Sequence, residues 1–143
     1  MDHFSRDQFL TRLDTRWRTY AERFYRLDPA EQRAYLDRQG YPSFGSLLAH
    51  VVAWWQEGAA VIAKMRADPT FPPPDYDVDT FNAQAVQKFS GMSETAMLEV
   101  YETQRQTMRD LVAGLSDADL DHEAINRRLF YEILGHWSEH ALD

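Results

Sequence analysis

The stretch SFGSLLAHVVAWWQEGAAVIAKMRAD, residues 43–68, decides the fold class. Its apolar residues recur at steps of three and four, which is the period of an amphipathic α-helix. Ser43 is a residue type that caps helices, and the three consecutive prolines of FPPPD at 71–75 exclude a continuation. The sequence therefore predicts one long helix from Ser43 to about Asp68. Its apolar face is formed by Leu47, Val51, Trp54, Gly58, Ile62 and Met65.

The same period continues on the N-terminal side of this stretch. Ser5 followed by Gln8 has the form of a capping box, and the apolar stripe behind it runs from Phe9 to Leu27. The residues 28–40 begin with an Asp-Pro pair and end with a glycine, which is typical of a short capped helix. We therefore expect one long helix and one short helix before Ser43.

Two further helices and one short helix are predicted after the prolines. Asp79 can cap a short helix over 79–90, and Ser93 can cap a long helix that Gly114 ends. Residues 116–121 have the composition of a turn, and the last helix covers roughly 126–142. The fold class predicted is all-α: a four-helix bundle with additional short helices in the connections, forming a single domain over 1–143.

Composition narrows the classes of function. The formal net charge is −8, which argues against nucleic-acid binding, because phosphates require a basic surface. The chain has no cysteine, so it has no disulfide, thiolate ligand or cysteine nucleophile. No apolar run approaches the roughly 18 residues of a membrane span, and the N-terminus lacks the apolar segment of a signal peptide. We expect a cytoplasmic protein whose partner is a small molecule.

The histidines carry the chemical signal. His136 and His140 are four residues apart in a predicted helix, so both imidazoles share one face and can reach one metal ion. His50 is the third histidine inside a predicted long helix, and a helical wheel places all three at the margins of apolar stripes. Facing margins of neighbouring helices would enclose a metal site near the surface of the core. The alternatives are a hydrogen-bonded His50 and a polar C-terminal histidine pair favoured by the helix dipole.

Several other side chains are candidates for the same site. Glu57 lies on the His50 face and could be a fourth ligand, a hydrogen-bond acceptor for a ligand or a general base, although solvated glutamates at such positions are commoner. Glu132 stands one turn before His136, and it too could either take part in the site or be a solvated residue. Aromatic and polar residues on the apolar stripes could form a pocket wall or belong to the core. These are Trp54, Tyr101, Gln104 and Trp137.

Three segments carry a resemblance to a known family. They are LLAHVVAWWQEG at 47–58, DVDTFNAQAV at 77–86 and YEILGHWSEHALD at 131–143. In their order and spacing the chain resembles the DinB/YfiT-like superfamily of metalloenzymes. FPPPDYD followed by DTFNAQ is most similar to the ClbS/DfsB branch.

The resemblance implies a four-helix bundle, often dimeric, with a divalent ion, zinc or nickel, on three histidines. The positions that match that triad are His50, His136 and His140. Some members of the family are transferases that use a low-molecular-weight thiol, and the ClbS/DfsB branch includes a hydrolase. A thiol would have to come from a cofactor here, because the chain has no cysteine.

Two functions and one assembly state follow as hypotheses. The first function is a metal-dependent enzyme of hydrolase or thiol-dependent transferase type, and the alternative is a non-catalytic protein that binds or sequesters a small molecule in an aromatic pocket. The predicted assembly is a homodimer, because apolar surface extends beyond the main stripes at Leu10, Tyr25, Phe130, Tyr131 and Leu134. The short helices could cover that surface instead.

Overall fold

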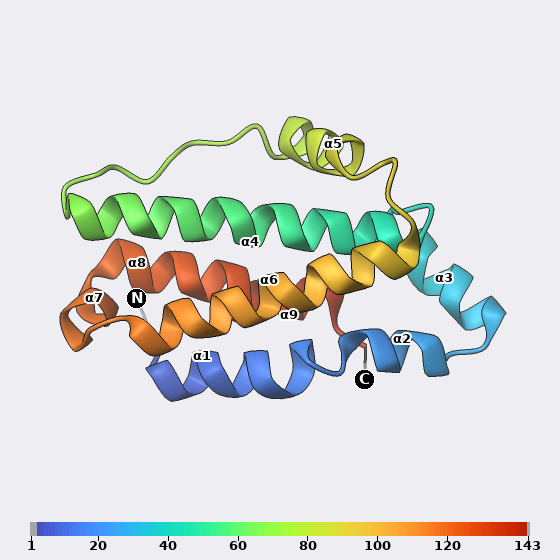
Figure 1. The fold of residues 1–143 in the computed structure, drawn as a ribbon, viewed down its shortest axis with the longest axis horizontal. Coiled ribbons are helices and arrows are strands. Elements are labelled where there is room, and N and C mark those ends of the chain that lie inside the picture. Colours follow the sequence, from blue (N-terminus) through green and yellow to red (C-terminus); the bar gives the residue numbers. More distant parts are fainter. Residues whose placement is uncertain (1–2, 143) are drawn as a thin grey trace.

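The computed structural model describes residues 3–142, and within that range it contains helices and no strands. Four rods run side by side (Figure 1). The first rod is built from α1 (Arg6–Arg12), the π-helical turn η1 (Leu13–Trp17) and α2 (Tyr20–Arg26). The second and third rods are α4 (Phe44–Ala67) and α6 (Glu94–Gly114). The fourth consists of α8 (Glu123–Leu129), the π-helical turn η2 (Phe130–Gly135) and α9 (His136–His140).

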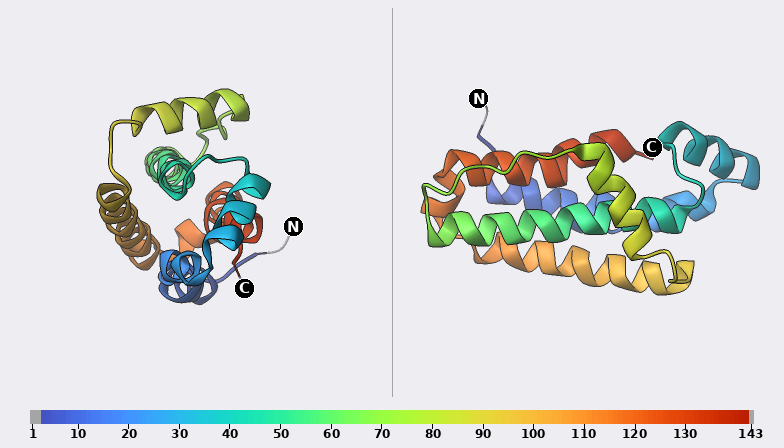
Figure 2. Two further views of the ribbon diagram at one scale, coloured as in Figure 1. Left: turned by 90° about the vertical axis from the view of Figure 1, so that its right-hand side faces the viewer. Right: turned by 90° about the horizontal axis from the view of Figure 1, so that it is seen from above.

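Three short helices lie in the connections. They are α3 (Pro29–Gln39), α5 (Val78–Lys88) and α7 (Asp117–Asp121). The rods α4 and α6 run in the same direction, so the chain must cross back between them, and it does so through the proline-rich connection and α5 (Figure 1). Seen end-on, the four rods form the corners of a bundle, and α5 crosses α4 on its outer side (Figure 2). The predicted fold class is confirmed.

The helix starts follow the local sequence closely. Ser5, Asp28 and Ser43 each form a capping box with the residue three positions later, and Ser93 caps α6. Gly40 ends α3 with a positive φ of 82°, a conformation that glycine adopts without steric cost. Capping chemistry acts within a few residues, which explains why these boundaries could be predicted from sequence.

Other predicted boundaries were wrong. Asp77, not Asp79, caps α5. Residues 116–121 are not only a turn, since Ser116 caps the short helix α7. The last rod begins at Glu123, where the His122 ring accepts from the Ile125 N–H, and it ends at His140 rather than Leu142. An imidazole cap is an uncommon device, so the sequence alone did not indicate it.

The two π-helical turns face each other across the core, where side chains bond their carbonyls. Trp17 Nε1 donates to the Ile133 carbonyl at 2.9 Å, and Trp55 Nε1 donates to the Glu132 carbonyl at 2.8 Å. The Tyr101 hydroxyl donates to the Trp17 carbonyl at 2.6 Å. A π-turn shifts the residues after it relative to an unbroken α-helix, and η2 directly precedes His136. Core aromatic residues therefore help to fix where α9 begins.

No helix among residues 3–142 combines the length and the apolar character that crossing a membrane requires.

Candidate metal centre

The structure brings His50, His136 and His140 together. One ring nitrogen from each lies within 4.8 Å of the other two, and this group contains no carboxylate. Nε2 of His136 is 3.2 Å from Nε2 of His50. The ring centroids of His50 and His140 are 5.2 Å apart, and those of His136 and His140, both on α9, are 4.8 Å apart. Helix α4 supplies the first histidine, and one turn of α9 supplies the other two.

All three side chains are more deeply buried than their positions on a helical wheel predicted. Their exposed fractions are 6%, 5% and 4% for His50, His136 and His140. The prediction of a site near the core surface is therefore corrected to a site inside the protein. The difference arises from the connections, which a wheel of one helix does not contain. The Tyr41 ring lies 5.3 Å from the ring of His50, and Asn82 of α5 contacts the same imidazole.

Two amide side chains fix the tautomers of two histidines. Trp54 Nε1 donates to Asn82 Oδ1 at 2.7 Å, which identifies that atom as the oxygen, and the same oxygen is 2.9 Å from His50 Nδ1. Because an amide oxygen only accepts, the proton of His50 is on Nδ1 and its Nε2 presents a lone pair.

Gln39 fixes the tautomer of His140 in the same way. Its Nε2 donates to the Glu139 carbonyl at 3.1 Å, and its Oε1 lies 2.7 Å from His140 Nδ1. The proton of this histidine is therefore also on Nδ1, and Nε2 is left as an acceptor. Such partners on the far ring nitrogen are typical of metal-binding histidines.

Burial keeps the three rings neutral. Desolvation lowers the pKa of His50 to about 4, against a smaller opposing effect of its hydrogen bond to Asn82. Desolvation, and next the charge of His50, lower the pKa of His140 to about 3. The pKa of His136 is lowered well below its ordinary value by burial first and then by the two neighbouring histidines. Neutral imidazole is the form that binds metal ions.

The histidine group fits a cation better than it fits an internal hydrogen-bond network. Among the described residues, His140 Nε2 is buried and has no hydrogen-bond partner, and it is the nitrogen that the contact with Gln39 leaves as an acceptor. A buried polar atom without a partner costs about 1–3 kcal/mol. Neighbouring nitrogens on a tetrahedral zinc ion are about 3.3 Å apart, given bonds of about 2.0–2.1 Å. The 3.2 Å between the Nε2 atoms of His50 and His136 is close to that separation.

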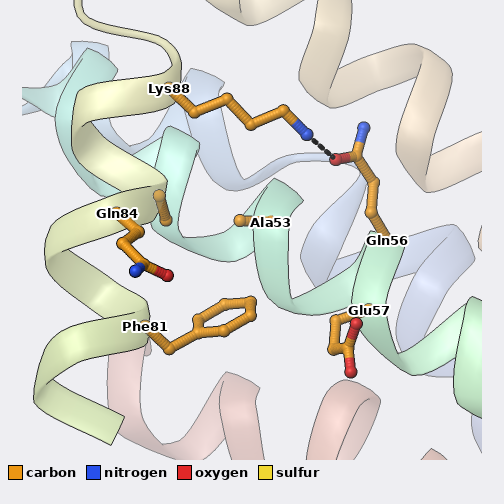
Figure 3. A pocket seen from close by; sticks show the side chains of 7 residues that line it. Ala53, Gln56, Glu57, Phe81, Gln84 and Lys88 are labelled. Atoms are coloured by element: carbon orange, nitrogen blue, oxygen red, sulfur yellow. Dashed lines mark hydrogen bonds between the residues drawn. The ribbon is translucent and has the colours of Figure 1, made fainter.

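The other candidate residues lie elsewhere. Glu57 faces a hollow of about 290 Å³ between α4 and α5, where Lys88 also donates to Gln56 (Figure 3). The carboxylate of Glu57 accepts from the Tyr76 hydroxyl at 2.7 Å and does not join the histidines. Glu132 is buried, with an exposed fraction of 4%, and pairs with Arg128 at 3.0 Å.

Of the predicted pocket-wall residues, Trp54 lines a cavity of about 350 Å³. Tyr101 is buried in the core at 3% exposure, and Trp137 packs edge-on against Trp17 with ring centroids 5.1 Å apart. The residues that sequence reasoning missed are Asn82, Gln39 and Tyr41. Asn82 lies within the quoted DTFNAQ segment, but no spacing linked it to His50, since α5 meets α4 only in three dimensions.

Comparison with known proteins adds the family. A family model described as the DinB superfamily matches residues 11–143. The chain belongs to the DinB superfamily. Comparison with curated proteins and with solved structures gave no match. Membership, together with three histidines at metal-binding separation, fits a metal-dependent enzyme.

Proposed function

We propose that this DinB protein is a metal-dependent enzyme in which His50, His136 and His140 hold a divalent ion, zinc or nickel. The observation that carries the proposal is the set of three buried, neutral imidazoles whose ring nitrogens converge to within 4.8 Å of one another. One of these nitrogens, Nε2 of His140, has no hydrogen-bond partner among the described residues. Three protein ligands leave a position on the ion for water or substrate, and a bound ion would lower the pKa of that water or thiol.

The chain's own residues would prepare the site before the ion arrives. Asn82 and Gln39 hold two Nε2 lone pairs in place, and Tyr41 with α5 keeps bulk water away from the rings. Preorganised neutral ligands need no proton release on binding, which favours tight uptake at neutral pH.

The reaction types that we propose are hydrolysis and thiol-dependent transfer. They rest on the resemblance to the ClbS/DfsB branch, and membership of that branch is part of the proposal. The absence of cysteine means that a thiol mechanism requires a low-molecular-weight thiol cofactor. A single domain over residues 1–143 and a cytoplasmic location are further proposals.

Metal content tests this function. Protein purified without a His-tag should contain about one zinc or nickel per chain by inductively coupled plasma mass spectrometry, or take it up after dialysis against a chelator. His140→Ala should lose that uptake, whereas His3→Ala, whose ring bonds the Leu120 carbonyl far from the site, should retain it. Absence of metal, together with no uptake of either ion, would reject the proposal.

A second candidate function is non-catalytic binding of a small molecule. It is favoured by a separate, mainly apolar cavity of about 350 Å³ in which Trp54 forms part of the wall. Chelation distinguishes the two functions: an enzyme of the proposed type loses turnover when the metal is removed, whereas a simple binder keeps its ligand affinity.

The homodimer is also a proposal. Tyr25 and Tyr131 are large side chains with exposed fractions of 44% and 59%, which supports it. Leu10, Phe130 and Leu134 instead pack partly buried against the core of the same chain. Sedimentation equilibrium at micromolar concentration should give about twice the single-chain mass of 16.7 kDa, and the single-chain mass would exclude the dimer.

A further inference from the structure

A cavity of about 350 Å³ lies in the groove between α4 and the α8–η2 rod, and none of the three histidines lines it. The connection after α4 closes one side of the cavity with Pro73, Pro74 and Tyr76. Trp54, one turn after His50, and Glu132, one turn before His136, belong to its wall. The cavity and the histidine group therefore occupy successive turns of the same two helices.

The wall is mainly apolar, with a guanidinium set into it. The side chain of Arg128 is only 12% exposed. Its Nε donates to Glu132 Oε2 at 3.0 Å and its Nη1 donates to the Tyr76 hydroxyl at 3.0 Å. Nη2 is buried and has no hydrogen-bond partner among residues 3–142. Arginine is a planar fork of five N–H donors, so part of this fork is left without an acceptor.

The neighbours of Arg128 hold the guanidinium in place. Its central carbon lies 5.2 Å from the centroid of the Tyr76 ring, and the Tyr76 hydroxyl in turn donates to Glu57 at 2.7 Å. The Trp54 ring meets the Tyr76 ring edge-on, with centroids 5.1 Å apart. A rigid cation beside flat aromatic walls suits a ligand with a planar body and one acidic group.

An anionic ligand fits these atoms better than a cationic one. The wall contains two arginines, Arg127 and Arg128, and one carboxylate, that of Glu132, which already pairs with Arg128. The unpartnered buried nitrogen belongs to the guanidinium, and it requires an acceptor.

We propose that this cavity binds a small, planar, apolar carboxylic acid, with its ring or rings between Trp54 and the prolines and its carboxylate on Arg128. A cavity of this size is at the lower end of small-molecule sites, which span about 300–1,000 Å³. One or two fused rings would fill it. The site goes beyond the proposed metal function, because no metal-binding histidine takes part in it.

Isothermal titration calorimetry with two probes of the same shape tests this site. Metal-free protein in the presence of a chelator is titrated with 2-naphthoate and, separately, with the neutral 2-naphthalenemethanol. We expect the carboxylate to bind at least about tenfold more tightly, since charge-assisted bonds to arginine are the stronger kind. Equal affinity for the two probes, or no binding of naphthoate at millimolar concentration, would overturn the proposal.

Variants test whether the charge of Arg128 is responsible for the preference for naphthoate. Arg128→Met/Glu132→Gln removes the ion pair without leaving a buried charge alone, and it should bind both probes equally. Glu132→Gln alone should bind naphthoate severalfold more tightly than the wild type, because it removes the carboxylate that competes for the guanidinium. Arg33→Met, on α3 at the other end of the bundle, is the control and should preserve the preference. A preference for naphthoate that persists in the double variant would reject the role of Arg128.

A measurement on the wild type tests the site even if a variant does not fold. In a nuclear magnetic resonance titration, naphthoate should shift the indole N–H signal of Trp54 and leave that of the core residue Trp17 unchanged. No shift at Trp54 on saturation would place the ligand elsewhere and refute the site. Metal uptake is measured on a chelator-free aliquot of the same preparation: naphthoate binding without metal uptake contradicts only the metal proposal, and the reverse contradicts only this cavity.

Discussion

The two ends of the bundle use histidine in different ways. At one end, His3 Nε2 lies 2.9 Å from the Leu120 carbonyl and His122 Nε2 lies 2.8 Å from the Pro69 carbonyl. These rings are partly exposed and bond to backbone that would otherwise need water. At the other end, His50, His136 and His140 are buried against one another, and Nε2 of His140 has no hydrogen-bond partner among residues 3–142. Satisfied histidines stabilise a fold, whereas buried, unsatisfied ones indicate a ligand.

The largest expected difference between the two ends is in stabilisation by metal. Zinc at about 1,000 times its Kd should raise the free energy of unfolding by about 4 kcal/mol, because it binds only the folded state. His136→Ala should lose this effect, and His122→Ala should keep it. Chemical denaturation with and without zinc measures both, and a zinc effect that survives in His136→Ala would contradict the difference between the ends.

The next largest effect concerns the amide that orients His50. Asn82→Ala removes the acceptor for both His50 Nδ1 and Trp54 Nε1, so we expect metal affinity to fall about 10- to 100-fold. Gln84→Ala, on the same helix but facing the hollow of Figure 3, is the matched control. Competition with a chromophoric chelator measures the Kd values. Equal affinities in the two variants would show that Asn82 does not prepare the site.

The pH dependence of the metal-free protein separates the two ends further. Burial depresses the pKa of His50 to about 4 and that of His140 to about 3, so between these values and the ordinary pKa of about 6.5 the unfolded chain binds more protons than the folded one. Their contribution to stability is complete above pH 6.5 and is lost as the pH falls. Glu132, whose pKa is raised to about 7 mainly by burial, opposes this trend.

We expect the free energy of unfolding to fall by roughly 2 kcal/mol or more from pH 7 to pH 4.5, since each unit of pKa shift corresponds to about 1.4 kcal/mol. Urea titrations at several pH values measure this loss. It should be smaller in His50→Asn/His140→Asn and unchanged in His3→Ala. A loss of the same size in the wild type, the double variant and His3→Ala would mean that other groups govern acid sensitivity.

The smallest effect is at the exposed end. His122→Ala removes an N-cap on α8 and the bond to the Pro69 carbonyl, and it should cost about 1 kcal/mol of unfolding free energy with no change in metal affinity. His122→Asn, which can still cap, should recover most of that loss. A change in metal affinity in either variant would show that the two ends are coupled.

These contrasts indicate what sequence alone could predict. The long helices, most of their caps and the pairing of His136 with His140 depend on residues a few positions apart, so the pattern predicts them. The approach of His50 to that pair was expected from facing helix margins and from the family resemblance. The burial of the group was not predicted, since it depends on Tyr41, Gln39 and α5, whose paths over the bundle are set by tertiary contacts. Arg128 was missed for the same reason, because Tyr76 reaches it from the proline-rich connection.

The close crossing of α4 and the last rod has an evolutionary consequence. A Cβ atom at Gly58 would clash with Oε2 of Glu132, so the buried carboxylate occupies the space that a side chain at position 58 would need. We therefore expect the two positions to vary together. In related chains we expect glycine at position 58 wherever position 132 is glutamate. A residue larger than glycine at position 58 should occur together with a residue shorter than glutamate at position 132. Exchange of Glu132 would at the same time change the counter-ion of Arg128.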